Sequence, residues 1–282
     1  MEYVGRVPCP PLDRFVDDIY CLSGMPRHRR MNIPPMPSAH LFLNLGAPVL
    51  LRDSAPGAPP AVLADGWFMG LWTRRFVVEY PAWVRLVGVH FKPWGMSPFV
   101  GVPAAELRDQ WLPVDTVWQR SVDRIRNRIG DTTSATGTLR VLVAELLSRL
   151  AETPPRGLDL VLHAGRRLVT SGGAIPVGAL ASGAGVSGNH LAAQFKAHVG
   201  VPSKRLARIY RFARLILSAD ARCPTGWPEL AHTAGYFDLD QAHCSREFKD
   251  VSGRTPTEYL ALRRRFPATP RFPPDAGPMP AD

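Results

Sequence analysis

The sequence predicts a multidomain α+β protein: a β-rich N-terminal half with a helical pair, and an all-α C-terminal half. Short apolar runs separated by Gly, Pro and Asp fill residues 39 to 91, which is typical of short strands. Beyond residue 103 apolar residues recur at helical spacing. A chain of 282 residues is long enough for two domains, each with its own core. We expect domains at 1–152 and 153–266, followed by a proline-rich, disordered tail at 267–282.

The N-terminal half is expected to form a small β-barrel or sandwich. Its candidate strands are residues 39–45, 49–51, 66–72, 76–80 and 84–91, with no long helix between them. Residues 12–23 are either a short helix or a strand. The basic run from Arg27 to Arg30 is interpreted as a solvated loop, with a DNA or phosphate contact as the alternative.

Aromatic and histidine side chains of this half raise two possible sites. The indoles of Trp67, Trp72, Trp83 and Trp94 could line an apolar effector pocket, or they could simply fill the core. His40 and His90 lie in predicted strands, but a metal needs three or four clustered ligands. We therefore predict no metal and no cofactor.

Two amphipathic helices follow. One carries Trp118, Val122, Ile125 and Ile129 on a single face. The apolar stripe of the other consists of Leu139, Leu142, Val143, Leu146 and Leu150. We expect an antiparallel pair that packs either on the β-rich part or on a second copy of the chain, which would make a homodimer.

Residues 175–260 contain the same pattern of helix, turn and second helix twice. In the first copy a short helix from Val177 is followed by a turn at Gly185 and a second helix opened by Ser187. The second copy has a helix from Pro228, a turn at Gly235 and another helix over 240–249. Two helix-turn-helix units are therefore predicted, each with a possible recognition helix.

The local chemistry supports this reading. A small residue, Ala181 or Ala231, precedes each turn glycine by four positions, which lets two helices approach closely. Ser187 can cap its helix, and Asp238 or Asp240 can do the same in the second copy. The pairs Leu191 with Phe195, and Cys244 with Phe248, are spaced to share a buried face.

One connecting helix, residues 203–219, is expected to hold the two units about one turn of DNA apart. Its predicted apolar stripe is Leu206, Ile209, Tyr210, Ala213 and Leu217. The side chains left over on the two recognition helices are mostly amides, imidazoles and cations, which can address base edges and phosphates. Double-stranded DNA is therefore the expected partner. The candidate DNA-binding residues are Ser187, Asn189, His190, Ala192, Ala193, Gln194, Lys196, Gln241, His243, Ser245, Arg246 and Lys249.

The pattern resembles the DNA-binding domain of the AraC/XylS family of transcriptional regulators. The resemblance rests on Gly185-x-Ser187-x-x-x-Leu191-x-x-x-Phe195-Lys196, on Gly200-x-Pro202, on Arg246-x-Phe248-Lys249 and on Gly253-x-x-Pro256-x-x-Tyr259-Leu260. It implies that the first recognition helix makes most base contacts, through Asn189, His190, Ala192 and Ala193, and the second fewer, through Gln241, Ser245 and Arg246.

This chain departs from the family pattern at three points. Ala193 stands where a base-contacting arginine is usual, and Cys244 replaces a bulkier core residue. The segment from Gly235 to Phe248 is two residues longer than usual. The resemblance also implies a cupin-like N-terminal domain that senses an effector or forms a dimer. Residues 88–107 look like the N-terminal domain of one uncharacterised branch of the family.

Positive charge is concentrated in the half of the chain that is predicted to bind DNA. Residues 160–282 hold sixteen Lys or Arg against nine Asp or Glu, and residues 1–159 hold eighteen against fifteen. Phosphate binding needs such an excess. Four cysteines without paired spacing suit a reducing cytoplasm, and neither a signal peptide nor a membrane span is predicted.

No catalytic motif is found, and Cys9 lacks the neighbouring cysteines that a nucleophilic site of its kind would use. We therefore predict a cytoplasmic, sequence-specific transcriptional regulator and not an enzyme. Two alternatives stay open. One is a small-molecule-binding protein or enzyme with secondary DNA binding, and the other is a protein that binds DNA without sequence choice.

Overall fold

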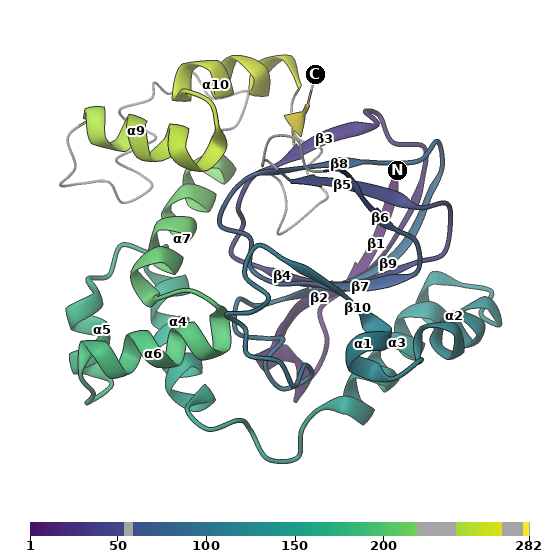
Figure 1. Ribbon diagram of the computed structural model, residues 1–282, viewed down its shortest axis with the longest axis horizontal. Coiled ribbons are helices and arrows are strands. Elements are labelled where there is room, and N and C mark those ends of the chain that lie inside the picture. Colours follow the sequence, from purple (N-terminus) through teal and green to yellow (C-terminus); the bar gives the residue numbers. More distant parts are fainter. Residues whose placement is uncertain (54–58, 219–240, 267–278, 282) are drawn as a thin grey trace.

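The computed structural model describes residues 1–53, 59–218, 241–266 and 279–281. Its N-terminal region is β-rich and is followed by helices, as the sequence predicts. Figure 1 shows the two facing sheets at the centre and right, with most of the C-terminal helices along the left side.

The larger sheet has six strands, and every pair of neighbouring strands in it is antiparallel. Its order is β1 (Glu2–Arg6), β2 (Val16–Gly24), β9 (Val84–Phe91), β4 (Ala39–Asn44), β7 (Gly66–Met69) and β10 (Trp111–Pro113). The smaller sheet has the order β11 (Met279–Pro280), β3 (Arg30–Ile33), β8 (Phe76–Glu79), β5 (Val49–Asp53) and β6 (Ala61–Leu63).

The five strands expected from the apolar runs are all present as β4, β5, β7, β8 and β9. Residues 12–23 contain both alternatives, a short 3-10 helix at Leu12–Arg14 and then β2. The expectation of a barrel is corrected, because within the described residues no strand pairing joins the two sheets. Each sheet instead ends in strands with a neighbour on one side only, β1 and β10 in the larger sheet and β11 and β6 in the smaller.

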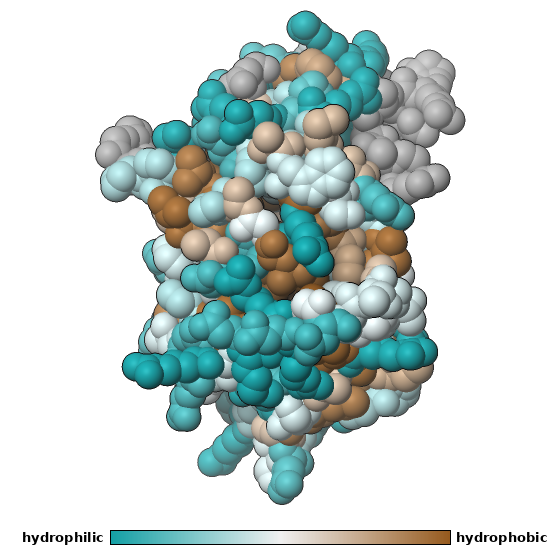
Figure 2. Space-filling view, turned by 90° about the vertical axis from the view of Figure 1, so that its right-hand side faces the viewer, coloured by the Kyte–Doolittle hydropathy of each residue, from teal (hydrophilic) through white to brown (hydrophobic). Residues whose placement is uncertain are grey.

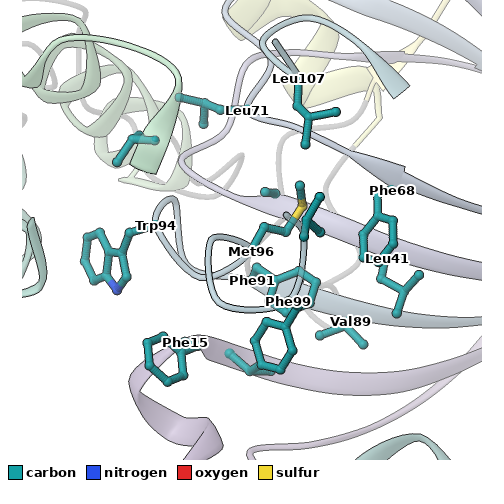
Figure 3. Close-up of a cluster of buried hydrophobic side chains, with 14 of the residues drawn as sticks. Phe15, Leu41, Phe68, Leu71, Val89, Phe91, Trp94, Met96, Phe99 and Leu107 are labelled. Carbon is teal, nitrogen blue, oxygen red and sulfur yellow. The ribbon is translucent and has the colours of Figure 1, made fainter. Parts of the chain in front are cut away.

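The larger sheet is buried on both faces. Alternate residues such as Leu41, Phe68 and Val89 point to one face, and Tyr20, Trp67 and Leu86 point to the other, toward the smaller sheet. This explains why its strands are almost continuously apolar instead of alternating with polar residues. Figure 3 shows the first of these layers, with Phe91, Met96 and Phe99 beside the sheet and Trp94 nearest the helices.

The helical pair packs within the chain. It consists of α2 (Val122–Gly130) and α3 (Ala135–Arg149), and α3 lies against β2. Trp118 does not start α2 as expected but ends a separate short helix, α1 (Val114–Trp118). The stripe formed by Leu139, Leu142 and Leu146 is buried in the main core. The contacts of α3 are thus accounted for without a second subunit.

Glu145 joins α2 to α3. Its side chain is only 2% exposed, and it receives hydrogen bonds from Arg124 at 2.7 Å, Arg128 at 3.2 Å and Arg149 at 2.6 Å. Burial disfavours the charged form, but the hydrogen bonds and charges of Arg124 and Arg149 outweigh it. The pKa of the Glu145 carboxyl therefore lies below its usual value.

The C-terminal half consists of helices. They are α4 (Leu158–Thr170), α5 (Val177–Gly183), α6 (Gly188–Val199), α7 (Ser203–Ser218), α9 (Gln241–Ser252) and α10 (Pro256–Arg265). Helix α7 confirms the connecting helix, although Leu217 is exposed and is not part of the buried stripe. Phe212, Leu215 and Ile216 are buried instead. Residues 228–240, which carry the start of the second predicted unit, lie outside the described residues.

The two halves share one buried cluster, and the N-terminal half has a further cluster of its own between the two sheets. One buried cluster runs from Phe15 and Phe91 in the N-terminal half to Leu168 and Phe195 in the helices. A second cluster joins Met36, from the loop before β4, to the core formed by α7, α9 and α10.

The tail also differs from expectation at one place. Met279 and Pro280 pair with Asn32 and Met31 of β3, so residues 279–281 pack on the sheet edge. The rest of the tail, residues 267–278 and 282, lies outside the described residues. Figure 2 shows the molecule from the right of Figure 1, where hydrophobic side chains reach the surface in the middle and hydrophilic ones lie above and below. Among the described residues no helix is long and apolar enough to cross a membrane.

The Glu145 cluster yields a prediction about stability. Because the folded-state pKa of Glu145 is lowered, its contribution to stability is present above its unfolded pKa and is lost as pH falls through the folded pKa. Glu145→Gln should lower the free energy of unfolding by about 1–3 kcal/mol near neutral pH. Urea denaturation of the mutant and of the exposed control Glu152→Gln measures this. A loss that did not shrink in acid, or that the control shared, would contradict it.

Candidate nucleic-acid interface

The two helices predicted for the first unit are present as α5 and α6, with the turn at Gly185 between them. Gly185 has φ +66°, a conformation that residues with a Cβ resist, and Ala181 is buried where the two helices meet. The hydroxyl oxygen of Ser187 accepts a hydrogen bond from the backbone N–H of His190 at 3.2 Å and so caps α6. The side chains of Leu191 and Phe195 are fully buried on one face of the helix.

The opposite face of α6 carries the candidate base-contacting residues. The side chains of Asn189, His190, Ala193 and Lys196 are exposed and that of Ala192 is half-buried. Gln194 differs from the other members of the set. It is half-buried, and its carboxamide lies in the space that a Cβ on Gly157 would occupy. The polar groups of the set that point to solvent are thus those of Asn189, His190 and Lys196.

The far end of α6 is held by the β-rich half. His198 is buried, and its Nε2 donates to the carbonyl oxygen of Arg156 at 3.0 Å. Its Nδ1 must then accept from the Ser97 hydroxyl at 2.7 Å in the neutral ring. In addition, the backbone N–H of Ala104 donates to the carbonyl oxygen of Ala197 at 3.0 Å. The β-rich half therefore fixes one end of this helix and leaves its first turns exposed.

The second predicted recognition helix, α9, is attached to α7 by a small core and an ion pair. Phe248 is buried between Phe212 and Tyr259, at ring-centroid distances of 5.2 and 5.3 Å. Glu247 is also buried, and it accepts a hydrogen bond from Arg208 of α7 at 3.0 Å. One face of α9 is thereby fixed against the connecting helix.

The exposed face of α9 presents the remaining candidates. Arg246 and Lys249 are exposed and Ser245 is half-buried. The side chains of Gln241, His243 and Cys244 fall outside the described residues, as do Ala231, the turn at Gly235, Asp238 and Asp240. Helices α6 and α9 thus lie beside α7 or its neighbours (Figure 1). Each exposes cationic side chains on the face turned away from that contact.

The inner face of the larger sheet carries a row of stacked rings. Tyr3 stacks on Tyr20 at 4.9 Å, Tyr20 on His90 at 4.4 Å, and His40 contacts His90 edge to face at 5.0 Å. Asp18 hydrogen-bonds His90 and Tyr3. His40 and His90 are thus neighbours, but the described residues contain no group of three or more possible metal ligands.

The four tryptophans do not line one pocket. Trp67 and Trp72 are buried between the two sheets, and Trp94 is buried on the other side of the larger sheet, where its Nε1 donates to the Arg14 carbonyl oxygen at 3.2 Å. Trp83 is 59% exposed. Only Trp67 and Trp72 therefore remain candidates for contact with an effector, and their indole N–H groups have no hydrogen-bond partner within the described residues.

Sequence reasoning missed the residues that position the two recognition helices. Periodicity marks His198 and Glu247 simply as polar members of a helix, and it gives Met36 no role at all. Their partners, Ser97, Arg208 and the α9–α10 core, are distant in the sequence. No spacing rule on a single helix could have identified these contacts.

Comparison with known proteins gives limited matches. A family model described as a domain of unknown function, DUF6597, matches residues 6–113. No curated protein matches. Among solved structures, ToxT from Vibrio cholerae strain SCE256 bound to an unsaturated fatty acid is similar, with a TM-score of 0.48, 11% identity, and coverage of 86% of this chain and 94% of that chain. ToxT from Vibrio cholerae O395 bound to (E)-4-(8-methylnaphthalen-1-yl)but-3-enoic acid has a TM-score of 0.46, 12% identity, and coverage of 86% and 97%.

The turn of the first unit provides a matched pair of mutations. Gly185 and Gly188 both have open space where a Cβ would point, but only Gly185 has a positive φ. Gly185→Ala should destabilise the protein by about 1 kcal/mol or more, whereas Gly188→Ala should stabilise it by about 0.4–1 kcal/mol. Urea denaturation compares them. If both mutations changed stability in the same direction, the proposed turn geometry would be wrong.

Proposed function

We propose that this protein is a transcriptional regulator that reads double-stranded DNA with two helix-turn-helix units. The observation that carries the proposal is the arrangement of α6 and α9, each of which buries one face on the protein and exposes amide, imidazole or cationic side chains on the other. Short helices capped and fixed in this way can enter a major groove without losing internal contacts. The resemblance to AraC/XylS regulators supports the same function.

The chemistry of each exposed side chain indicates whether it would contact a base or a phosphate. Asn189 can form paired hydrogen bonds with adenine, and Arg246 with guanine. His190 lies next to Asn189 at the exposed start of α6, where the first turns of a recognition helix meet base edges. Lys196 and Lys249 occupy positions further along each helix and are suited to phosphates. Binding would therefore combine base readout with general attraction to the backbone.

Selection of bound duplexes from a random pool, at about physiological salt, tests the function. We expect one enriched motif with two contacted segments about one helical turn apart. Binding without enrichment would indicate a protein that binds DNA without sequence choice. No binding at all, in the presence of a folded protein, would contradict the proposal.

Two exposed residues on α9 separate the two kinds of contact. Arg246→Ala should reduce the discrimination between the selected site and a scrambled duplex by about 1–3 kcal/mol, because a base contact is lost. Lys249→Ala should weaken binding to both duplexes by similar factors, because phosphates are common to both. Fluorescence anisotropy with the two duplexes measures both effects. Identical behaviour of the two variants would refute the assigned roles.

Response to an effector is the second part of the proposal. Trp72 is buried with an unpartnered indole N–H, and the next residue, Thr73, is bonded to the DNA-reading half: its carbonyl oxygen accepts from Arg205 of α7 at 3.4 Å. Asp109 holds the same residue through the Thr73 hydroxyl at 2.8 Å. A small apolar molecule with an acceptor oxygen, bound between the sheets, would therefore act next to this link.

A panel of small carbonyl compounds tests the effector site by thermal unfolding. We expect a compound that raises the Tm of the native chain but not that of Trp72→Phe, which keeps a ring and removes the N–H. If every compound acted equally on both proteins, Trp72 would have no part in effector binding.

A further inference from the structure

A concave site lies at the edge of the smaller sheet, away from the two recognition helices. It has a volume of about 440 Å³ and is lined by the four consecutive residues from Arg27 to Arg30, by Glu79 of β8, by Phe266 after α10 and by Pro280 of β11. Pockets of this size accommodate small molecules. One wall is closed by the tail, because the Ala281 N–H donates to the Arg30 carbonyl oxygen at 3.0 Å.

The charge of this pocket is strongly positive. Arg27, Arg29 and Arg30 face a single carboxylate, Glu79, and that carboxylate already has a partner in Arg52 at 3.5 Å. Arg27 and Arg29 thus give the pocket an excess of positive charge that a bound anion would neutralise. A phosphate group matches the planar, forked geometry of arginine.

Two of these arginines are available to a ligand. The Nε of Arg29 donates to the Tyr80 carbonyl oxygen at 3.2 Å, which orients the guanidinium and leaves its terminal nitrogens to other acceptors. Arg27 is exposed and has no hydrogen-bond or ion-pair partner among the described residues. Neither side chain would have to break an ion pair in order to bind an anion.

The remaining wall is aromatic. The ring of Phe266 meets the ring of His28 edge to face at a centroid distance of 5.2 Å, and the guanidinium of Arg265 lies 5.3 Å from the Phe266 centroid. A flat ring held beside guanidinium groups offers stacking for a planar ligand as well as charge for its anionic end. An inorganic ion would use only the charge and not the stacking surface.

We propose that this pocket binds a small phosphate-bearing molecule with a planar ring, of the nucleotide class. Arg27 and Arg29 hold the phosphate, and Phe266 stacks on the ring. This site is separate from the DNA-reading helices and from the space between the sheets, and it does not depend on the function proposed above.

Isothermal titration of the full chain with AMP, with inorganic phosphate and with a short DNA duplex tests the site. We expect AMP to bind more tightly than phosphate. Arg27→Ala and Arg29→Ala should each reduce AMP affinity about tenfold or more, since each removes a charge-assisted hydrogen bond. Phe266→Leu should reduce AMP affinity and leave phosphate affinity unchanged. The exposed Arg140→Ala on α3, which removes the same charge elsewhere, is the matched control.

The outcomes that overturn the proposal are distinct. Absence of AMP binding at millimolar concentration, or equal losses in Arg27→Ala and Arg140→Ala, would contradict it. If AMP does not bind and Arg27→Ala weakens duplex binding alone, the basic run contacts DNA phosphates and the small-molecule site is wrong. Equal affinity for AMP and phosphate, unchanged by Phe266→Leu, would remove the role of the ring. Thermal unfolding of each variant shows that it remains folded.

Discussion

Trp94 and Gly165 make the close contact that joins the β-rich half to the C-terminal helices. Trp94 lies three residues after the end of β9, and its ring fills the place where a Cβ on Gly165 of α4 would stand. Only glycine permits this approach. The outer face of the larger sheet, which is too apolar to be left in water, is covered partly by α3 and partly by the segment from Trp94 to Leu107 and the helices behind it. The largest buried cluster therefore belongs to both halves of the chain.

This shared core holds the two predicted recognition helices in fixed positions. Helix α6 is fixed at its buried end by His198, Ser97 and Ala104, and α9 is fixed to α7 by Phe248 and Glu247. Each helix can therefore present its exposed side chains without moving as an independent module. Arg205 of α7 donates to the carbonyl oxygen of Thr73, the residue after Trp72, so we propose that a change near Trp72 reaches α7 through few contacts. Regulation by a small molecule needs a physical connection of this kind.

Local sequence patterns predicted the first helix-turn-helix candidate and the main strands. The turn at Gly185, the cap at Ser187 and the buried pair Leu191 and Phe195 follow from spacing within one helix-turn-helix, where neighbours in sequence are neighbours in space. The five main strands followed in the same way from apolar runs. The open arrangement of the sheets, the burial of Gln194 against Gly157 and the strand at Met279 depend on contacts between distant residues. The arginine cluster at Arg27 was visible as a run, but its pocket is completed by Phe266, which no local pattern connects to it.

We propose that α6 and α9 bind DNA as one rigid unit. The most direct measurement is the affinity of the protein for its selected site with one or two base pairs inserted between the two contacted segments. Each inserted pair moves the segments by about 3.4 Å and rotates them by roughly a tenth of a turn. A rigid reader should lose tenfold or more in affinity with either insertion, because only one helix can keep its base contacts. Unchanged affinity across the insertions would show that the two units move independently, and would contradict this account.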